Sequence, residues 1–142
     1  SYVADDTYKT FFHGHSFTAN PLACTAALAS LDLLEKKTCL HKIDWITQSN
    51  KKFEAQLKRG QWNIKNLRTA GTLLAFEIVQ GKDEYLNNIS AAITTIAMEH
   101  GVYLRPLGNT VYIMPPYCIT EEELQKVYNC IIYMLEQLKK NS

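Results

Sequence analysis

The segment His13-Gly14-His15-Ser16 combines a permissive glycine backbone with a hydroxyl group, a few residues before a helix start at Asn20-Pro21. Backbone N–H groups and a serine hydroxyl can both donate hydrogen bonds to a phosphate, so the pattern indicates a phosphate-binding loop. The alternative is an ordinary turn, in which Gly14 bends the chain and Ser16 forms a local hydrogen bond. The pattern by itself favours the ordinary turn.

The two histidines of this segment and Cys24 offer three candidate ligands for a metal ion. No fourth ligand lies nearby at a usual zinc spacing, so the sequence argues against a metal site. A cysteine nucleophile is also disfavoured, because Cys24 and Cys130 lie among apolar helical residues, where we expect them to be buried and unreactive. The four cysteines include no Cys-x-x-Cys pair, which favours a reduced, cytoplasmic setting over a disulfide framework.

Arg105 is the second candidate for chemistry, because it ends a short apolar run directly before Pro106. An arginine at such a place can present its planar fork of donors to a carboxylate. The alternative is an ordinary arginine that pairs with Glu77 or with solvent, and without other information this alternative is favoured. Three tyrosines near Arg105 in the sequence either line an apolar pocket or are plain core or surface aromatics: Tyr103, Tyr112 and Tyr117.

The elements that must position these residues follow from the apolar periodicity. Asn20 as N-cap and Pro21 at the first helical position predict a helix over about 21–36. A second helix is predicted over about 40–58, and alternating apolar residues predict two strands, around 62–67 and 74–78. A turn at 81–83, a helix over about 84–100 and two short strands at 102–105 and 110–114 follow. Thr120 and Glu123 form a capping box that predicts the start of the last helix.

This order of elements predicts an α+β domain with two layers. The chain has 142 residues, of which 46% are hydrophobic and 20% charged, an ordinary globular composition that can bury a core. Its formal net charge of +1 argues against a nucleic-acid or membrane-surface protein. We expect no membrane span, because no apolar run approaches about 20 residues, and the first residues do not resemble a signal peptide.

Two longer segments carry a family resemblance. Residues 12–24 read Phe-His-Gly-His-Ser-Phe-Thr-Ala-Asn-Pro-Leu-Ala-Cys, and residues 101–117 read Gly-Val-Tyr-Leu-Arg-Pro-Leu-Gly-Asn-Thr-Val-Tyr-Ile-Met-Pro-Pro-Tyr. The first resembles the stretch that follows the catalytic lysine of class III pyridoxal-phosphate aminotransferases. The second is similar to the C-terminal signature of those members that act in biotin biosynthesis. The resemblance covers nearly the whole chain from about Lys9 onward.

The resemblance implies a role for each candidate residue. Ser16 would bind the phosphate of pyridoxal 5'-phosphate, reaching it from the neighbouring subunit of a homodimer, and the backbone of Gly14 and His15 would contribute. Arg105 would hold the carboxylate of the substrate 8-amino-7-oxononanoate, with Tyr112 and Gly14 also at the substrate site. The amino group would come from S-adenosylmethionine.

The resemblance also implies the fold and the domains. The chain would contain the small C-terminal domain of a fold-type I pyridoxal-phosphate transferase, a short and mostly antiparallel sheet packed by helices, preceded by two connecting helices. Residues 1–60 would hold the end of the large-domain segment and two connecting helices, and residues 61–142 the small α+β domain. The lysine that carries the cofactor lies upstream of the His-Gly motif in this family, and Lys9 is too close to the motif to be that residue. We therefore expect the chain alone to be inactive.

Two other functions remain open on the sequence. One is the C-terminal part of a class III aminotransferase that acts on another ω-amino acid, which the Arg-Pro-x-Gly and Tyr-x-Met-Pro-Pro-Tyr elements disfavour. The other is a non-catalytic α+β binding module. If the source gene encodes a strand with a lysine shortly before Ser1, the interpretation as a non-catalytic binding module is excluded.

Overall fold

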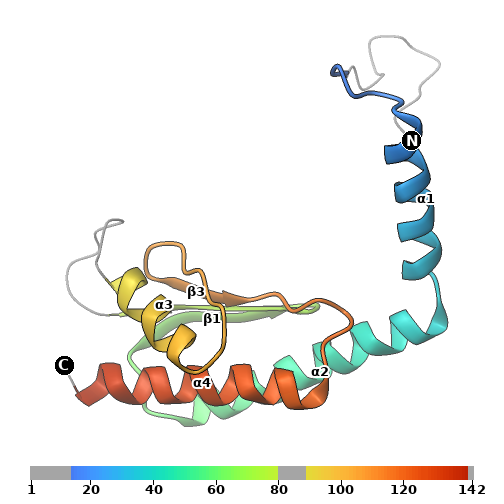
Figure 1. Cartoon of the computed structure of the whole chain (residues 1–142). Helices are drawn as coiled ribbons and strands as arrows, with labels where there is room; N and C mark the ends of the chain where they lie inside the picture. Colours follow the sequence, from blue (N-terminus) through green and yellow to red (C-terminus); the bar gives the residue numbers. More distant parts are fainter. Residues whose placement is uncertain (1–13, 80–88, 141–142) are drawn as a thin grey trace, which may run out of the picture. The chain divides into compact units, whose positions relative to one another are not determined.

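The computed structural model describes residues 14–79 and 89–140, which fall into two units, one up to Lys36 and one from Lys37 onward. Helices and strands follow the order α1-α2-β1-β2-α3-β3-α4 (Figure 1). The predicted α+β class is confirmed. In the described residues, no helix is both long and apolar enough to cross a membrane.

The first unit contains one helix, α1 (Pro21–Leu34), which begins where the sequence predicts. The Asn20 Oδ1 atom accepts hydrogen bonds from the backbone N–H groups of Leu22 and Ala23, at 3.0 and 3.2 Å. No residue of α1 is buried within the chain, and Cys24 is exposed. The expectation that Cys24 is buried is therefore wrong, because the described part of this unit holds no second helix or strand against which α1 can pack.

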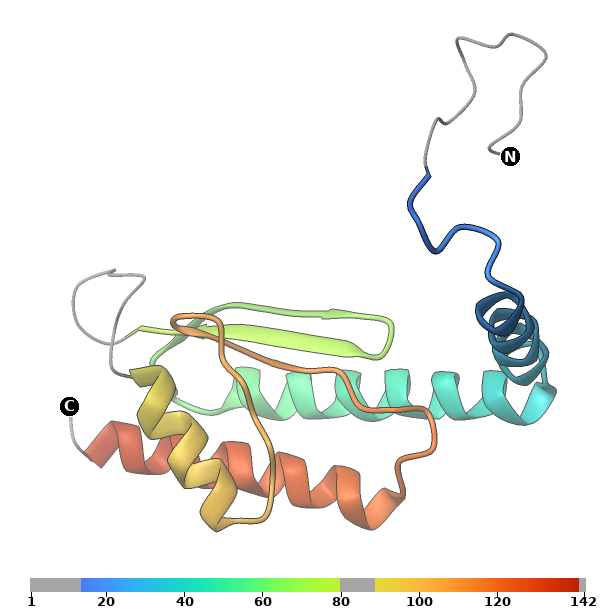
Figure 2. The same ribbon diagram turned by 45° about the horizontal axis from the view of Figure 1, so that its top comes forward.

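The second unit is built on α2 (Lys37–Arg59) and a three-stranded antiparallel sheet. The sheet has the order β1 (Ile64–Ala70), β2 (Leu73–Ile78) and β3 (Thr110–Ile113). Figure 2 shows α2 and α4 (Glu121–Lys140) on the same side of this sheet. The side chains buried between the layers come from alternate strand positions and from one stripe of each helix; they include Ile46, Phe53, Leu57, Leu74, Phe76, Val111, Ile131 and Met134.

The residues before β3 differ from the prediction. The third helix, α3 (Ile89–Glu99), ends near the expected residue, while its predicted first turns and the turn at 81–83 lie outside the described residues. Residues 102–105 are extended but form no strand, so this prediction is wrong. The reason is that the segment bonds to α3 rather than to β3: the N–H of Val102 donates to the carbonyl of Ala97 at 2.9 Å. Only Leu107 and Thr110 form an isolated bridge.

The last helix begins as predicted. The hydroxyl of Thr120 accepts from the N–H of Glu123 at 3.2 Å, and the Glu123 carboxylate accepts from the N–H of Thr120 at 2.8 Å. These two bonds form the capping box, which satisfies backbone donors that the first turn of α4 leaves without helical partners. Donation from the backbone N–H of Thr120, with a smaller effect of its side chain, lowers the pKa of the Glu123 carboxyl, because it favours the charged form.

A buried polar link joins α4 to α2. The Tyr128 hydroxyl donates to Oδ1 of Asn50 at 2.7 Å, and Nδ2 of Asn50 donates to the carbonyl of Thr72 at 2.8 Å. The ring of Tyr128 stacks on Phe53 with 4.2 Å between ring centroids. Burial raises the pKa of Tyr128 above its ordinary value of 10.0, because a phenolate would lose its hydration there.

Raising the pH above about 10 is therefore expected to destabilise the second unit through Tyr128. The folded chain keeps the Tyr128 proton at pH values at which the unfolded chain releases it, so this contribution is complete below the unfolded pKa and is lost above it. Urea unfolding should show a steeper loss of stability for the parent chain than for Tyr128→Phe, from about pH 9 to about pH 11. Tyr133→Phe, at a side chain that is 40% exposed, serves as the control. Equal pH slopes for the parent and Tyr128→Phe would contradict the prediction.

Candidate functional site

The loop before α1 is organised by His15. The N–H of His15 donates to the Thr18 hydroxyl at 2.9 Å, and the N–H of Thr18 donates back to the carbonyl of His15 at 2.9 Å. The N–H of Phe17 donates to Nδ1 of His15 at 3.0 Å. Because Nδ1 accepts this bond, the neutral imidazole carries its proton on Nε2. These contacts form a tight turn with Ser16 near its tip.

Ser16 is available to bind a ligand. It is exposed, and among the described residues it forms no hydrogen bond, so the alternative of a locally bonded Ser16 does not describe this loop. Gly14 leaves open space where a side chain would begin, with nothing within 4 Å of an added Cβ atom. A hydroxyl donor beside an uncrowded backbone suits an approaching phosphate group. His13, the first residue of the predicted motif, lies outside the described residues.

The N-terminus of α1 supplies less to this loop than the sequence suggested. Two of its first N–H groups already donate to Asn20, and a third, of Cys24, donates to the Asn20 carbonyl at 2.9 Å. The N–H groups of His15, Phe17 and Thr18 are also bonded within the turn, so the Ser16 hydroxyl is the foremost donor left for a phosphate.

Arg105 lies in a groove of the second unit with a volume of about 610 Å³. The groove runs between the extended segment at 101–105, the end of β3 and the first half of α4. Its lining residues include Tyr103, Arg105, Tyr112, Met114, Glu123 and Lys126. The structure therefore brings two of the three tyrosines near Arg105 in sequence into its groove, whereas Tyr117 is not among the lining residues.

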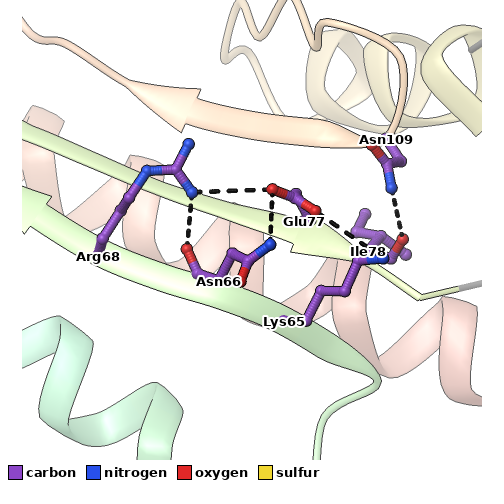
Figure 3. A network of polar contacts seen from close by, with 6 residues as sticks. All are labelled: Lys65, Asn66, Arg68, Glu77, Ile78 and Asn109. Carbon is purple, nitrogen blue, oxygen red and sulfur yellow. Dashed lines mark hydrogen bonds and ion pairs between the residues drawn. The ribbon is translucent and has the colours of Figure 1, made fainter.

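The guanidinium of Arg105 has no ion pair or hydrogen bond among the described residues. Glu77, the partner suggested by the alternative interpretation, is engaged by β1 instead (Figure 3). Its carboxylate accepts from Nδ2 of Asn66 at 3.0 Å and lies 3.9 Å from Arg68 and 4.0 Å from Lys65. Arg105 thus lines a groove and forms no ion pair of its own among the described residues, an arrangement that suits an anionic ligand.

Tyr112 reaches the same groove from the sheet. It pairs with Ala75 of β2 and is half-buried, while its neighbours Val111 and Ile113 point into the core. Strand alternation therefore directs the Tyr112 side chain away from the core to which Val111 and Ile113 contribute. Its hydroxyl can donate or accept a hydrogen bond at a ligand held by Arg105.

The sequence did not indicate that Glu123 and Lys126 line this groove, and it identified Glu123 only as the capping-box partner of Thr120. Both belong to α4, which meets the Arg105 segment only through tertiary packing, so the linear pattern contained no signal for their place at the groove. Lys126 lies close to Gly101, whose φ of 63° requires the left-handed backbone region.

Cys24 and Cys130, the two cysteines considered as nucleophiles, differ in burial, and Cys24 is exposed. Cys130 is buried as expected, and burial raises the pKa of its thiol, which disfavours a nucleophilic thiolate. Among residues 14–79 and 89–140, no group of three or more His, Cys, Asp or Glu side chains could hold a metal ion.

Comparison with known proteins assigns this architecture to a family. The model of the family described as Aminotransferase class-III matches residues 3–135. Adenosylmethionine-8-amino-7-oxononanoate aminotransferase of Synechococcus elongatus is 37% identical over 130 residues, covering 91% of this chain and 30% of that protein. The Helicobacter pylori protein of the same name is 34% identical, covering 98% of this chain and 32% of that protein.

The fold agrees with this assignment. The crystal structure of adenosylmethionine-8-amino-7-oxononanoate aminotransferase from Methanocaldococcus jannaschii superposes with a TM-score of 0.76 at 28% identity, covering 91% of this chain and 30% of that one. The chain thus spans about a third of the length of the relatives it matches, and it corresponds to their C-terminal part. By its family match and its fold, the chain belongs to the class III aminotransferases, which are pyridoxal-phosphate enzymes.

Proposed function

We propose that the chain works as the C-terminal part of the biotin-biosynthesis enzyme that transfers an amino group from S-adenosylmethionine to 8-amino-7-oxononanoate, giving 7,8-diaminononanoate. The observation that carries the proposal is Arg105, a cation without an ion pair in the described residues, at a groove that also contains Tyr112. An oxononanoate ends in a carboxylate, which is the group that arginine binds best. The names of the most similar relatives support this substrate over other ω-amino acids.

Arg105 supplies binding and orientation rather than proton transfer. A guanidinium offers only N–H donors, and its parallel N–H groups fit both oxygens of a carboxylate. Holding the far end of the substrate in this way places its ketone at a set distance from the reacting centre. Tyr112, on the same groove, is proposed to donate from its hydroxyl to the substrate.

The loop at 14–16 is proposed to hold the phosphate of pyridoxal 5'-phosphate, with Ser16 as donor and with backbone contributions from Gly14 and His15, while Gly14 also borders the substrate. The cofactor, when bound, supplies the electron-accepting ring that makes amino transfer possible. In this proposal the enzyme is a cytoplasmic homodimer, and the loop acts on the neighbouring subunit's cofactor. Residues 1–60 complete the large domain and its connecting helices, and residues 61–142 form the small domain.

The lysine that carries the cofactor is proposed to lie outside these 142 residues. The isolated chain should then neither fix the cofactor covalently nor transfer amino groups. Incubation with pyridoxal phosphate, borohydride reduction and peptide mass analysis tests this. Attachment at one specific lysine of this chain would contradict the proposal.

Replacing Ser16 in the complete enzyme tests the cofactor role. Ser16→Ala should weaken pyridoxal-phosphate binding by about tenfold, the value of one charge-assisted hydrogen bond. Ser16→Thr keeps the hydroxyl and should bind nearly as the parent does. Ser30→Ala, at an exposed serine of α1, is the matched control. Equilibrium dialysis of the cofactor gives the measurement, and unchanged affinity of Ser16→Ala would reject the role.

A further inference from the structure

The side chains around Arg105 alternate between buried and exposed. Val102, Leu104 and Pro106 are buried, whereas Tyr103 and Arg105 between them are exposed. This alternation is that of a strand, yet the segment has no ladder of hydrogen bonds to β3. Something other than the sheet must therefore set the position and direction of the Arg105 side chain.

The contacts that replace the sheet come from α3. The Thr94 hydroxyl lies 3.2 Å from the carbonyl oxygen of Leu104, and the Ser90 hydroxyl lies 3.4 Å from that of Pro106. These are the two carbonyls on either side of Arg105. Ser90 and Thr94 are one helical turn apart, so both face the segment, which runs beside α3 in both views (Figures 1 and 2).

Of the two hydroxyls, that of Thr94 lies closer to the backbone of the Arg105 segment than that of Ser90. Its hydroxyl lies within hydrogen-bond distance of two carbonyl oxygens, that of Leu104 at 3.2 Å and that of Ser90 at 2.9 Å, and has one proton to donate to them. Thr94 is half-buried, and the Leu104 side chain beside it is only 4% exposed, so a rotation of this peptide would move a packed side chain. Hydroxyl contact and packing together fix the peptide that precedes Arg105.

We propose that Thr94, assisted by Ser90, is a positioning residue for Arg105, which it orients toward the groove through the Leu104 backbone. The proposal rests on the proposed function, because it assumes that Arg105 binds the substrate carboxylate. A bidentate arginine–carboxylate contact tolerates errors of only about 0.5 Å and about 10–20°. The carbonyls on either side of Arg105 bond to α3 rather than to the sheet, so the segment needs such an anchor to keep within that tolerance.

The test uses the complete enzyme and steady-state kinetics for both substrates. Thr94→Val removes the hydroxyl with little change in shape and is expected to raise KM for 8-amino-7-oxononanoate about three- to tenfold. The kcat and the KM for S-adenosylmethionine should stay within about twofold, since the loss is one of carboxylate binding. Thr94→Ser should restore KM, and Thr95→Val, on the adjacent exposed position, should leave it unchanged.

A double-mutant cycle separates this role from a merely structural one. If Thr94 acts through Arg105, Thr94→Val should have no further effect on KM in an Arg105→Ala background. An equal effect in both backgrounds, an unchanged KM, or a parallel loss of kcat and both KM values would overturn the proposal. If Thr94→Val does not fold, Ser90→Ala takes its place with a smaller rise in the same KM, and no rise then rejects the proposal. An unchanged KM of Arg105→Ala itself would instead reject the proposed function.

Discussion

Replacing Arg105 with alanine in the complete enzyme is expected to raise KM for 8-amino-7-oxononanoate about 10- to 100-fold. A hydrogen bond between charged partners contributes about 1.5–3 kcal/mol, which corresponds to this range. The effect should fall mainly on KM, because the carboxylate is bound alike in the ground state and the transition state. Arg105→Lys keeps the charge but loses the planar fork, so it should recover only part of the affinity.

The control for Arg105 is Arg59→Ala, at the exposed end of α2. It removes the same charge far along the chain from the groove and should leave KM unchanged. Steady-state rates over a range of substrate concentrations, with S-adenosylmethionine saturating, measure both variants. A KM of Arg105→Ala equal to that of the parent would show that Arg105 does not bind the substrate carboxylate.

Replacing Asn50 with alanine should produce the largest loss of stability, about 3 kcal/mol. Asn50 is fully buried and uses both ends of its amide, one toward Tyr128 and one toward Thr72. Its removal leaves the buried Tyr128 hydroxyl and the part-buried Thr72 carbonyl without these partners, and it also leaves a cavity. Since a domain is stable by only about 5–15 kcal/mol, the loss is a large fraction of the total.

Urea unfolding of the 142-residue chain gives the measurement, with Gln48→Ala on the exposed side of the same helix as the control. The control should change the free energy of unfolding by no more than about 0.5 kcal/mol. Tyr128→Phe in both backgrounds should show coupling, because the two residues share one hydrogen bond. Additive losses would mean that the buried link does not stabilise the fold as described.

Local signals predicted the elements that depend on local chemistry. Asn20 with Pro21, and Thr120 with Glu123, mark helix starts through side chains that bond to nearby backbone groups, and both starts are confirmed. The strand predicted at 102–105 does not form, because an alternating apolar run can be buried without the hydrogen bonds that join strands in a sheet. Whether such a run pairs with β3 or bonds to α3 is decided by distant residues such as Thr94.

The candidate site likewise combines residues that local sequence indicates with contacts that depend on distant residues. The residue type and the Pro106 neighbour singled out Arg105, and strand alternation brought Tyr112 to its groove. The partner of Glu77 could not be predicted, because a bulge between Lys65 and Arg68, with Asn66 at a φ of 52°, turns those side chains toward it. Cys24 was expected to be buried because the alanine-rich composition of α1 indicates packing, which the first unit itself does not supply.

The central claim is that Arg105 recognises the carboxylate of the substrate. The most direct test compares kcat/KM for 8-amino-7-oxononanoate and for its methyl ester, which lacks only that charge, in the parent enzyme and in Arg105→Ala. The parent should prefer the acid by about 10- to 100-fold, and Arg105→Ala should lose that preference. A preference that persists undiminished in Arg105→Ala would contradict the claim, because the carboxylate would then be bound elsewhere.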